Sequence, residues 1–182
     1  MQNLNTYKNF YFVGIGGIGM SALARYFHAA GKNVLGYDKT ETKLTTELQN
    51  EGISISFEDV VDEKFSELNK ENTLVIYTPA IKVLGILDYF NQNGFEVLKR
   101  AKVLGLITEN TECISVAGTH GKTTTSSLVA HLCKVANLPF SGFLGGIAEN
   151  YKSNFIYNGT EISVLEADEY DRSFLNLSPD WA

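Results

Sequence analysis

The chain has 182 residues, 44% of them hydrophobic and 20% charged, a composition that excludes a disordered chain and accommodates one large domain or two small ones. No apolar run approaches the roughly 20 residues of a membrane helix, and the first residues lack a signal-peptide core, so we expect a cytoplasmic protein without a membrane partner. The net charge is −6 and the 15 basic residues are scattered along the chain, which argues against a nucleic-acid partner.

Strand-like and helix-like segments alternate through the first hundred residues. The expected strands are 10–13, 34–37, 53–57, 74–77 and 95–98, and the expected helices are 18–30, 42–50, 62–69 and 84–93. Such alternation with short connections is typical of a parallel sheet covered by helices. The pattern therefore predicts an α/β fold with a Rossmann-like parallel sheet.

A second unit is expected after a helix at 100–108. It contains a strand at 113–117, a helix at 122–136 and a strand at 161–166, while 137–160 is rich in Gly and Asn and is interpreted mostly as loop. We therefore expect a domain over 1–108 and an incomplete one over 109–182, because two strands and one helix are too little for a stable sheet domain. This indicates a fragment of a longer protein. Cys113 and Cys133 lack metal-site spacing and are expected to be unpaired in a reducing cytoplasm.

The first glycine loop matches G-x-G-x-x-G between a strand and a helix. Its residues are Gly14-Ile15-Gly16-Gly17-Ile18-Gly19. Gly14 permits the tight turn, Gly16 lets the backbone approach a pyrophosphate, and Gly19 allows close helix–strand packing. Asp38, at the end of the second strand, is placed to meet a ribose hydroxyl. The loop indicates a nucleotide diphosphate but does not choose between NAD, FAD and a UDP-sugar, and a tight turn without a ligand is the structural alternative.

The second glycine loop, residues 117–125, also joins a strand to a helix. It reads Ala117-Gly118-Thr119-His120-Gly121-Lys122-Thr123-Thr124-Thr125 and keeps the G-K-T core of a P-loop, although Val116 stands where the first Gly of the full motif is expected. Backbone amides from Gly118 onward can surround phosphates, the Lys122 ammonium can meet the β and γ phosphates, and the Thr123 hydroxyl can ligate Mg2+. The pattern predicts an ATP site. For His120, contact with a substrate and shaping of the loop are equally open.

Four carboxylates follow the last expected strand. They are Glu166, Asp168, Glu169 and Asp171. The carboxyl edge of a parallel sheet is where ligands bind, and Glu166, at the last strand position, is the best candidate for a metal ligand. The other three are candidates for a supporting role, and a solvated acidic turn is the structural alternative.

Six segments in order carry a family resemblance. They are FVGIGGIGM (12–20), YTPAI (77–81), RA (100–101), VAGTHGKTTT (116–125), FLGGI (143–147) and EADEYDRSF (166–174). Together they resemble the Mur ligases of peptidoglycan synthesis, over nearly the whole chain.

The resemblance implies a UDP-binding domain of Rossmann type followed by the opening of a central P-loop ATPase domain. It implies that the first glycine loop receives the UDP diphosphate, with Asp38 and the turn Thr78-Pro79-Ala80 near it. Lys122 and Thr123 would serve ATP and Mg2+, and Glu166 would help to bind the metal, Lys122 and Glu166 being the catalytic candidates. The implied substrates are UDP-N-acetylmuramate and L-alanine, joined through an acyl phosphate formed with ATP.

Three alternatives stay open at this point. One is the family's murein-recycling ligase, which joins a tripeptide to UDP-N-acetylmuramate. The others are an NAD-dependent oxidoreductase, favoured by the first loop and opposed by the second, and a non-catalytic UDP-sugar-binding module. By itself the chain is expected to lack ligase activity, and its oligomeric state is not indicated.

Overall fold

The computed structural model describes residues 3–61, 65, 68–81, 84–167 and 174–182. These residues form two compact units, Met1–Arg100 and Ala101–Ala182. From the sequence, the boundary is expected after residue 108, whereas all but the first residue of the helix α4 (Arg100–Thr108) groups with the second unit.

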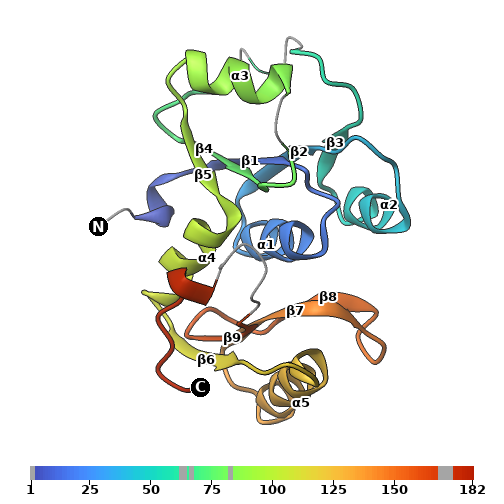
Figure 1. The fold of residues 1–182 in the computed structure, drawn as a ribbon, viewed down its shortest axis with the longest axis vertical. Coiled ribbons are helices and arrows are strands. Elements are labelled where there is room, and N and C mark those ends of the chain that lie inside the picture. Colours follow the sequence, from blue (N-terminus) through green and yellow to red (C-terminus); the bar gives the residue numbers. More distant parts are fainter. Residues whose placement is uncertain (1–2, 62–64, 66–67, 82–83, 168–173) are drawn as a thin grey trace. The chain divides into compact units, whose positions relative to one another are not determined.

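The first unit is built on a five-stranded, fully parallel sheet of order β3-β2-β1-β4-β5 (Figure 1). Its strands are β1 (Asn9–Val13), β2 (Asn33–Tyr37), β3 (Ser54–Ser56), β4 (Thr73–Tyr77) and β5 (Glu96–Lys99). Its helices are α1 (Ile18–Ala29), α2 (Lys43–Asn50) and α3 (Gly85–Gln92), after a short 3-10 turn, η1 (Leu4–Thr6). This confirms the predicted Rossmann-like parallel sheet, although the helix expected at 62–69 lies largely outside the described residues. The strand order reverses between β1 and β4, which is where ligands bind in such sheets.

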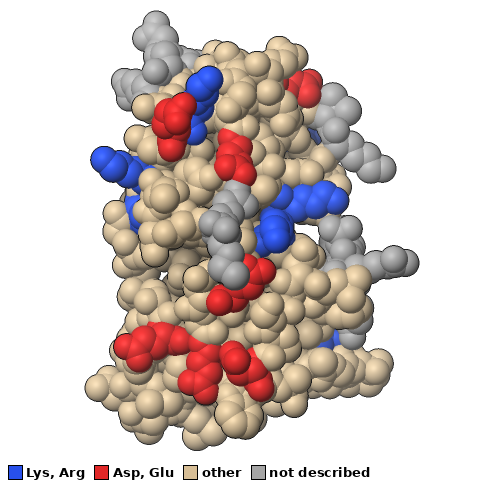
Figure 2. Space-filling view, turned by 90° about the vertical axis from the view of Figure 1, so that its left-hand side faces the viewer, with Lys and Arg blue, Asp and Glu red and all other residues tan. Residues whose placement is uncertain are grey.

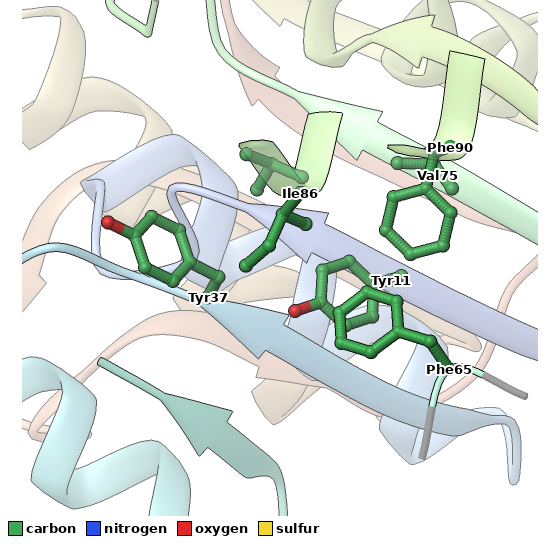
Figure 3. Packing of buried hydrophobic residues seen from close by; sticks show 7 residues of the cluster. Tyr11, Tyr37, Phe65, Val75, Ile86 and Phe90 are labelled. Atoms are coloured by element: carbon green, nitrogen blue, oxygen red, sulfur yellow. The ribbon is translucent and has the colours of Figure 1, made fainter. Parts of the chain in front are cut away.

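Strand β1 is buried on both faces, as its continuous apolar sequence indicates. Alternate side chains of a strand point to opposite faces. Phe10 stacks on Phe27 of α1 with ring centroids 3.8 Å apart. On the other face, Tyr11 packs with Phe65 and with Phe90 of α3 (Figure 3). Helices on both sides therefore hold β1, and the loop that follows it, in place.

The second unit contains a mixed four-stranded sheet of order β6-β9-β7-β8. Its strands are β6 (Glu112–Val116), β7 (Phe140–Ala148), β8 (Ser153–Tyr157) and β9 (Ile162–Glu166), and the helix α5 (Lys122–Val135) follows β6. Strands β6 and β7 flank β9 and run parallel to it, while β8 is antiparallel to β7. A core cluster that includes Ala130, Phe140 and Val164 joins α5 to this sheet.

The expectation of a loop over 137–160 is wrong. Most of this segment forms the β7–β8 hairpin. Gly142, Gly145 and Gly146 lower the strand propensity of β7, but residues 140–143 pair with β9, and residues 141–143 and 148 pair with β8, which stabilises the strand. The second unit therefore has four strands where the sequence indicated two.

Three general features can be examined in the described residues. None of the helices in the described part of the chain is long and apolar enough to cross a bilayer. Basic side chains occur in separate places among acidic and uncharged ones on the face shown in Figure 2. Cys113 and Cys133 are both buried and unpaired.

Candidate nucleotide-binding sites

The first glycine loop leaves β1 at the point where the strand order reverses. Gly14 has a φ of +89°, which favours glycine, and a Cβ there would lie 2.7 Å from the Ile81 side chain and 2.8 Å from that of Thr78. The loop therefore lies directly against the Thr78-Pro79-Ala80 turn after β4. The fold brings together two groups that the sequence analysis had connected only through the family resemblance.

The backbone amides at the start of this loop already have partners within the protein. Gly14 and Ile15 donate to the carbonyl of Tyr37 at 2.7 and 3.0 Å, and the Gly16 amide donates to Oδ2 of Asp38 at 2.7 Å. The Ile15 side chain is fully buried. The Gly17 amide also has a partner, the Gly14 carbonyl at 3.3 Å. The N-terminus of α1 follows directly, and because helix N-termini attract anions it is the part of the loop where a diphosphate stays predicted.

Asp38 has a structural role that the sequence did not indicate. Besides accepting from Gly16 through Oδ2, it accepts from the Thr40 amide through Oδ1 at 3.2 Å. A Cβ at Gly16 would lie 2.9 Å from this carboxylate, so the glycine lets Asp38 close on the loop. Each carboxylate oxygen can accept a further hydrogen bond, so contact with a ribose hydroxyl stays a prediction.

Gly19 makes room for an arginine. A Cβ at this position would lie 2.5 Å from Nη1 of Arg100, so the third glycine accommodates the guanidinium group beside the first turn of α1 where the sequence predicted close helix–strand packing. The sequence reasoning noted the Arg100-Ala101 pair without assigning it a role. Gly19 and Arg100 are far apart in the sequence, so only the fold shows that a cationic side chain lies beside the predicted diphosphate position.

The second glycine loop spans the gap between β6 and α5. Gly118 (φ +141°) and Gly121 (φ +78°) both adopt positive φ angles, and Gly121 is the N-cap of α5. Lys122 begins the helix, and its ammonium group folds back to donate to the Gly118 carbonyl at 2.6 Å. The loop residues Thr119 and His120 and, on the first turn of α5, Thr124 are exposed. Val116, in place of the motif's first Gly, is the last residue of β6 and pairs with Glu166.

Parallel pairing of β6 with β9 brings Glu166 to the second glycine loop. The Thr123 hydroxyl donates to Oε2 of Glu166 at 3.1 Å. The described residues contain no group of three or more His, Cys, Asp or Glu side chains that could hold a metal alone. Mg2+ usually takes one or two protein oxygen ligands together with phosphates and water, and the Thr123–Glu166 pair fits that requirement. Asp168, Glu169 and Asp171 lie outside the described residues.

Sequence reasoning missed two residues of this site. Ser126 donates a hydrogen bond to Oε1 of Glu166 at 2.9 Å, and the Gly145 amide donates to the same oxygen at 2.8 Å. Signals existed for both. Ser126 is three residues after Thr123, hence on the same helix face, and Gly145 belongs to the FLGGI segment.

Comparison with known proteins identifies the family. Residues 9–111 match the model of the Mur ligase family, catalytic domain. The chain belongs to the Mur ligase family. The resemblance seen in the sequence is thereby confirmed.

Curated Mur ligases match the chain over 98–100% of its length. It is 55% identical over 182 residues to a UDP-N-acetylmuramate--L-alanine ligase of Flavobacterium psychrophilum, covering 100% of this chain and 41% of that protein. It is 52% identical to the ligase of the same name from Parabacteroides distasonis, covering 98% of this chain and 39% of that protein. The chain thus spans about two fifths of the length of these relatives.

Two solved structures share the fold. A UDP-N-acetylmuramate-alanine ligase from Thermotoga maritima matches with a TM-score of 0.81 and 32% identity, over 94% of this chain and 40% of that one. A UDP-N-acetylmuramate:L-alanyl-gamma-D-glutamyl-meso-diaminopimelate ligase from Neisseria meningitides matches with a TM-score of 0.80 and 26% identity, over 97% of this chain and 59% of that one.

Proposed function

We propose that this chain is the UDP-sugar-binding and ATP-binding portion of a ligase that joins L-alanine to UDP-N-acetylmuramate. The first unit would bind the UDP-sugar, and the second would bind ATP with Mg2+. Curated Mur ligases that match 98–100% of the chain at 52–55% identity have this activity in their names, which supports the choice of substrates.

The observation that carries the proposal is the position of the Thr123–Glu166 pair beside the second glycine loop. A hydroxyl and a carboxylate 3.1 Å apart, next to a lysine ammonium and a loop with two positive-φ glycines, are suited to a nucleoside triphosphate with its divalent cation. Hydride transfer by an NAD-dependent oxidoreductase requires neither a triphosphate loop nor a divalent-cation site. The pair therefore favours phosphoryl transfer over hydride transfer.

The proposed reaction proceeds in two steps. The muramate carboxylate attacks the γ phosphorus of ATP, giving an acyl phosphate and ADP. The L-alanine amine then attacks the acyl carbon, and the resulting tetrahedral intermediate expels inorganic phosphate and leaves the amide. In the first step Lys122, turned from the Gly118 carbonyl to the phosphates, would neutralise charge that accumulates on the γ-phosphoryl group.

Thr123 and Glu166 would hold Mg2+, which would supply further charge neutralisation at the phosphates. In the first unit, the positive N-terminal end of α1 and the Arg100 guanidinium would receive the diphosphate of the UDP-sugar. Asp38 and the Thr78-Pro79-Ala80 turn would border the same ligand.

The murein-recycling ligase is the second candidate. The structural match to the Neisseria meningitides tripeptide ligase is nearly as good as that to the Thermotoga maritima enzyme, but the sequence identity is lower, 26% against 32%. The identity therefore favours L-alanine as the amine substrate.

Calorimetric titration of the 182-residue chain tests the two sites separately. We expect UDP-N-acetylmuramate to bind and NAD not to bind. We also expect ATP with Mg2+ to bind, and Lys122→Ala to weaken ATP by roughly tenfold or more, since a charged hydrogen bond contributes about 1.5–3 kcal/mol. Because Lys122 lies in the second unit, the variant should bind the UDP-sugar as the wild type does. Binding of NAD in place of the UDP-sugar, or ATP affinity insensitive to Lys122→Ala, would contradict the proposal.

A further inference from the structure

The carboxylate of Glu166 is held asymmetrically. Oε1 accepts two hydrogen bonds, from the Ser126 hydroxyl at 2.9 Å and from the Gly145 amide at 2.8 Å. Oε2 accepts from the Thr123 hydroxyl at 3.1 Å. The two oxygens of this half-buried side chain therefore have different surroundings.

Ser126 is suited to a fixed supporting contact. It is completely buried on α5, and its oxygen also lies 3.1 Å from the Thr123 carbonyl. A buried hydroxyl with no solvent to turn toward keeps its hydrogen directed at these acceptors. Ser127, the next residue, is only partly buried, so its hydroxyl is not confined in this way.

Gly145 contributes through its backbone and through its missing side chain. The pairing of β7 with β9 ends at Phe143–Leu165, and the β7–β8 register shifts between Phe143 and Ala148. This irregularity releases the Gly145 amide to the side chain of Glu166, as bulges near functional sites often do. A Cβ at residue 145 would lie 2.5 Å from Oε2 and 3.0 Å from Cδ of Glu166, so another residue would displace the carboxylate.

We propose that Ser126 and Gly145 are positioning residues of the metal site, which hold Oε1 of Glu166 so that Oε2 is the oxygen offered to the cation beside Thr123. The inference rests on the proposed function, because it presupposes a divalent cation bound with ATP. The Thr123 hydroxyl, while donating to Oε2, keeps lone pairs that can face the same cation. The FLGGI segment thereby acquires a role. Its Gly145 directs a backbone amide at the Glu166 carboxylate and has no side chain to displace it.

The test uses Mn2+ as a paramagnetic probe on the 182-residue chain with ATP. Free Mn2+ is measured by electron paramagnetic resonance. We expect Ser126→Ala, which removes a supporting hydrogen bond, and Gly145→Ala, whose Cβ would displace the carboxylate, each to weaken Mn2+ binding by roughly tenfold or more, as disturbed supporting contacts do at other metal sites. ATP binding in EDTA should stay unchanged, Ser126→Thr should recover most of the affinity, and Ser127→Ala should match the wild type.

A metal-free measurement tests the hydrogen bonds themselves. In the amide NMR spectrum without metal, the Gly145 resonance should shift in Glu166→Gln and in Ser126→Ala, but not in Ser127→Ala. If the amide chemical shift of Gly145 is unchanged in Glu166→Gln, the inference is wrong.

The remaining outcomes separate the two proposals. If wild-type chain binds Mn2+ with ATP, and Ser126→Ala and Ser127→Ala bind it equally well, the positioning role is wrong while the proposed function stands. If the wild type binds neither ATP nor Mn2+ although Gly145 responds to Glu166→Gln, the proposed function fails, and the metal role of these residues fails with it.

Discussion

Three glycines of the first glycine loop are required for three different reasons. Gly14 lies against Thr78 and Ile81, Gly16 lets Asp38 reach the loop, and Gly19 leaves space for Arg100. The motif G-x-G-x-x-G thus describes a set of close approaches, and each partner comes from a distant part of the chain. The role of each glycine is therefore known only when the side chain that it approaches is known.

The two cysteines provide a residue-scale prediction of pH dependence. Burial raises the pKa of the Cys113 thiol, and Asp180 raises it further while a hydrogen bond with Ser163 lowers it. Burial likewise raises the pKa of Cys133. Because both thiols keep their protons longer in the folded state than in the unfolded state, their contribution to stability is complete below the unfolded pKa and is lost as the pH rises toward the folded pKa.

We therefore expect the free energy of unfolding to fall above about pH 8.5, by at most about 1.4 kcal/mol per pH unit for each thiol. Urea denaturation between pH 7 and pH 10 measures this fall in the free energy of unfolding. The double variant Cys113→Ala, Cys133→Ala should lose much of this slope. Identical slopes for wild type and variant would show that the thiols do not titrate in this way.

At the scale of elements, a buried arginine joins α1 to α2. Arg25 on α1 has a side chain only 6% exposed, and its Nε and Nη2 donate to Glu51 at the end of α2 at 2.7–3.0 Å. Glu47 lies 3.6 Å from the same guanidinium. The pair holds α2 against α1.

Removing Glu51 should be costly, because it leaves a buried guanidinium with a weaker partner. For Glu51→Ala we expect a loss of about 2–3 kcal/mol, less than the roughly 3–5 kcal/mol for a fully buried pair, because the Glu51 side chain is 40% exposed and Glu47 stays nearby. Lys43→Ala is the matched control. It removes an ion pair with Glu47 whose lysine is 94% exposed and should cost less than about 0.5 kcal/mol.

Urea denaturation of both variants at neutral pH measures the two losses. Equal losses would mean that burial of Arg25 does not determine the strength of the interaction.

At the scale of the whole molecule, the proposed function would place each ligand in a single compact unit. UDP-N-acetylmuramate should therefore slow hydrogen exchange within 1–100, and ATP with Mg2+ should slow it within 101–182. At a ligand concentration a hundred times the dissociation constant, the free energy of opening should rise by up to about 2.7 kcal/mol. Exchange measured by mass spectrometry on the chain with each ligand checks this. Protection of the second unit by the UDP-sugar alone would contradict the assignment of one ligand to each unit.

Much of the first unit could be predicted because its signals are local. Strand β1 is a short apolar run followed by a glycine turn, and Thr42 caps the N-terminus of α2 and forms a capping box with Thr45. Each of these features depends on residues only a few positions apart. The parallel sheet then follows from the alternation of such segments.

The rest depends on contacts between distant residues. The glycines of β7 obscure a strand that is stabilised by its neighbours on both sides, and α3 receives its N-terminal cap from Asp59, 26 residues before it in the sequence. Glu166 meets Thr123 across 43 residues and Ser126 across 40. The sequence alone determined the α/β class, the family and the two glycine loops, because local patterning encodes them. Only the tertiary structure decided which oxygen of Glu166 is held and that Gly19 makes room for Arg100, because strand pairing and helix packing bring those partners together.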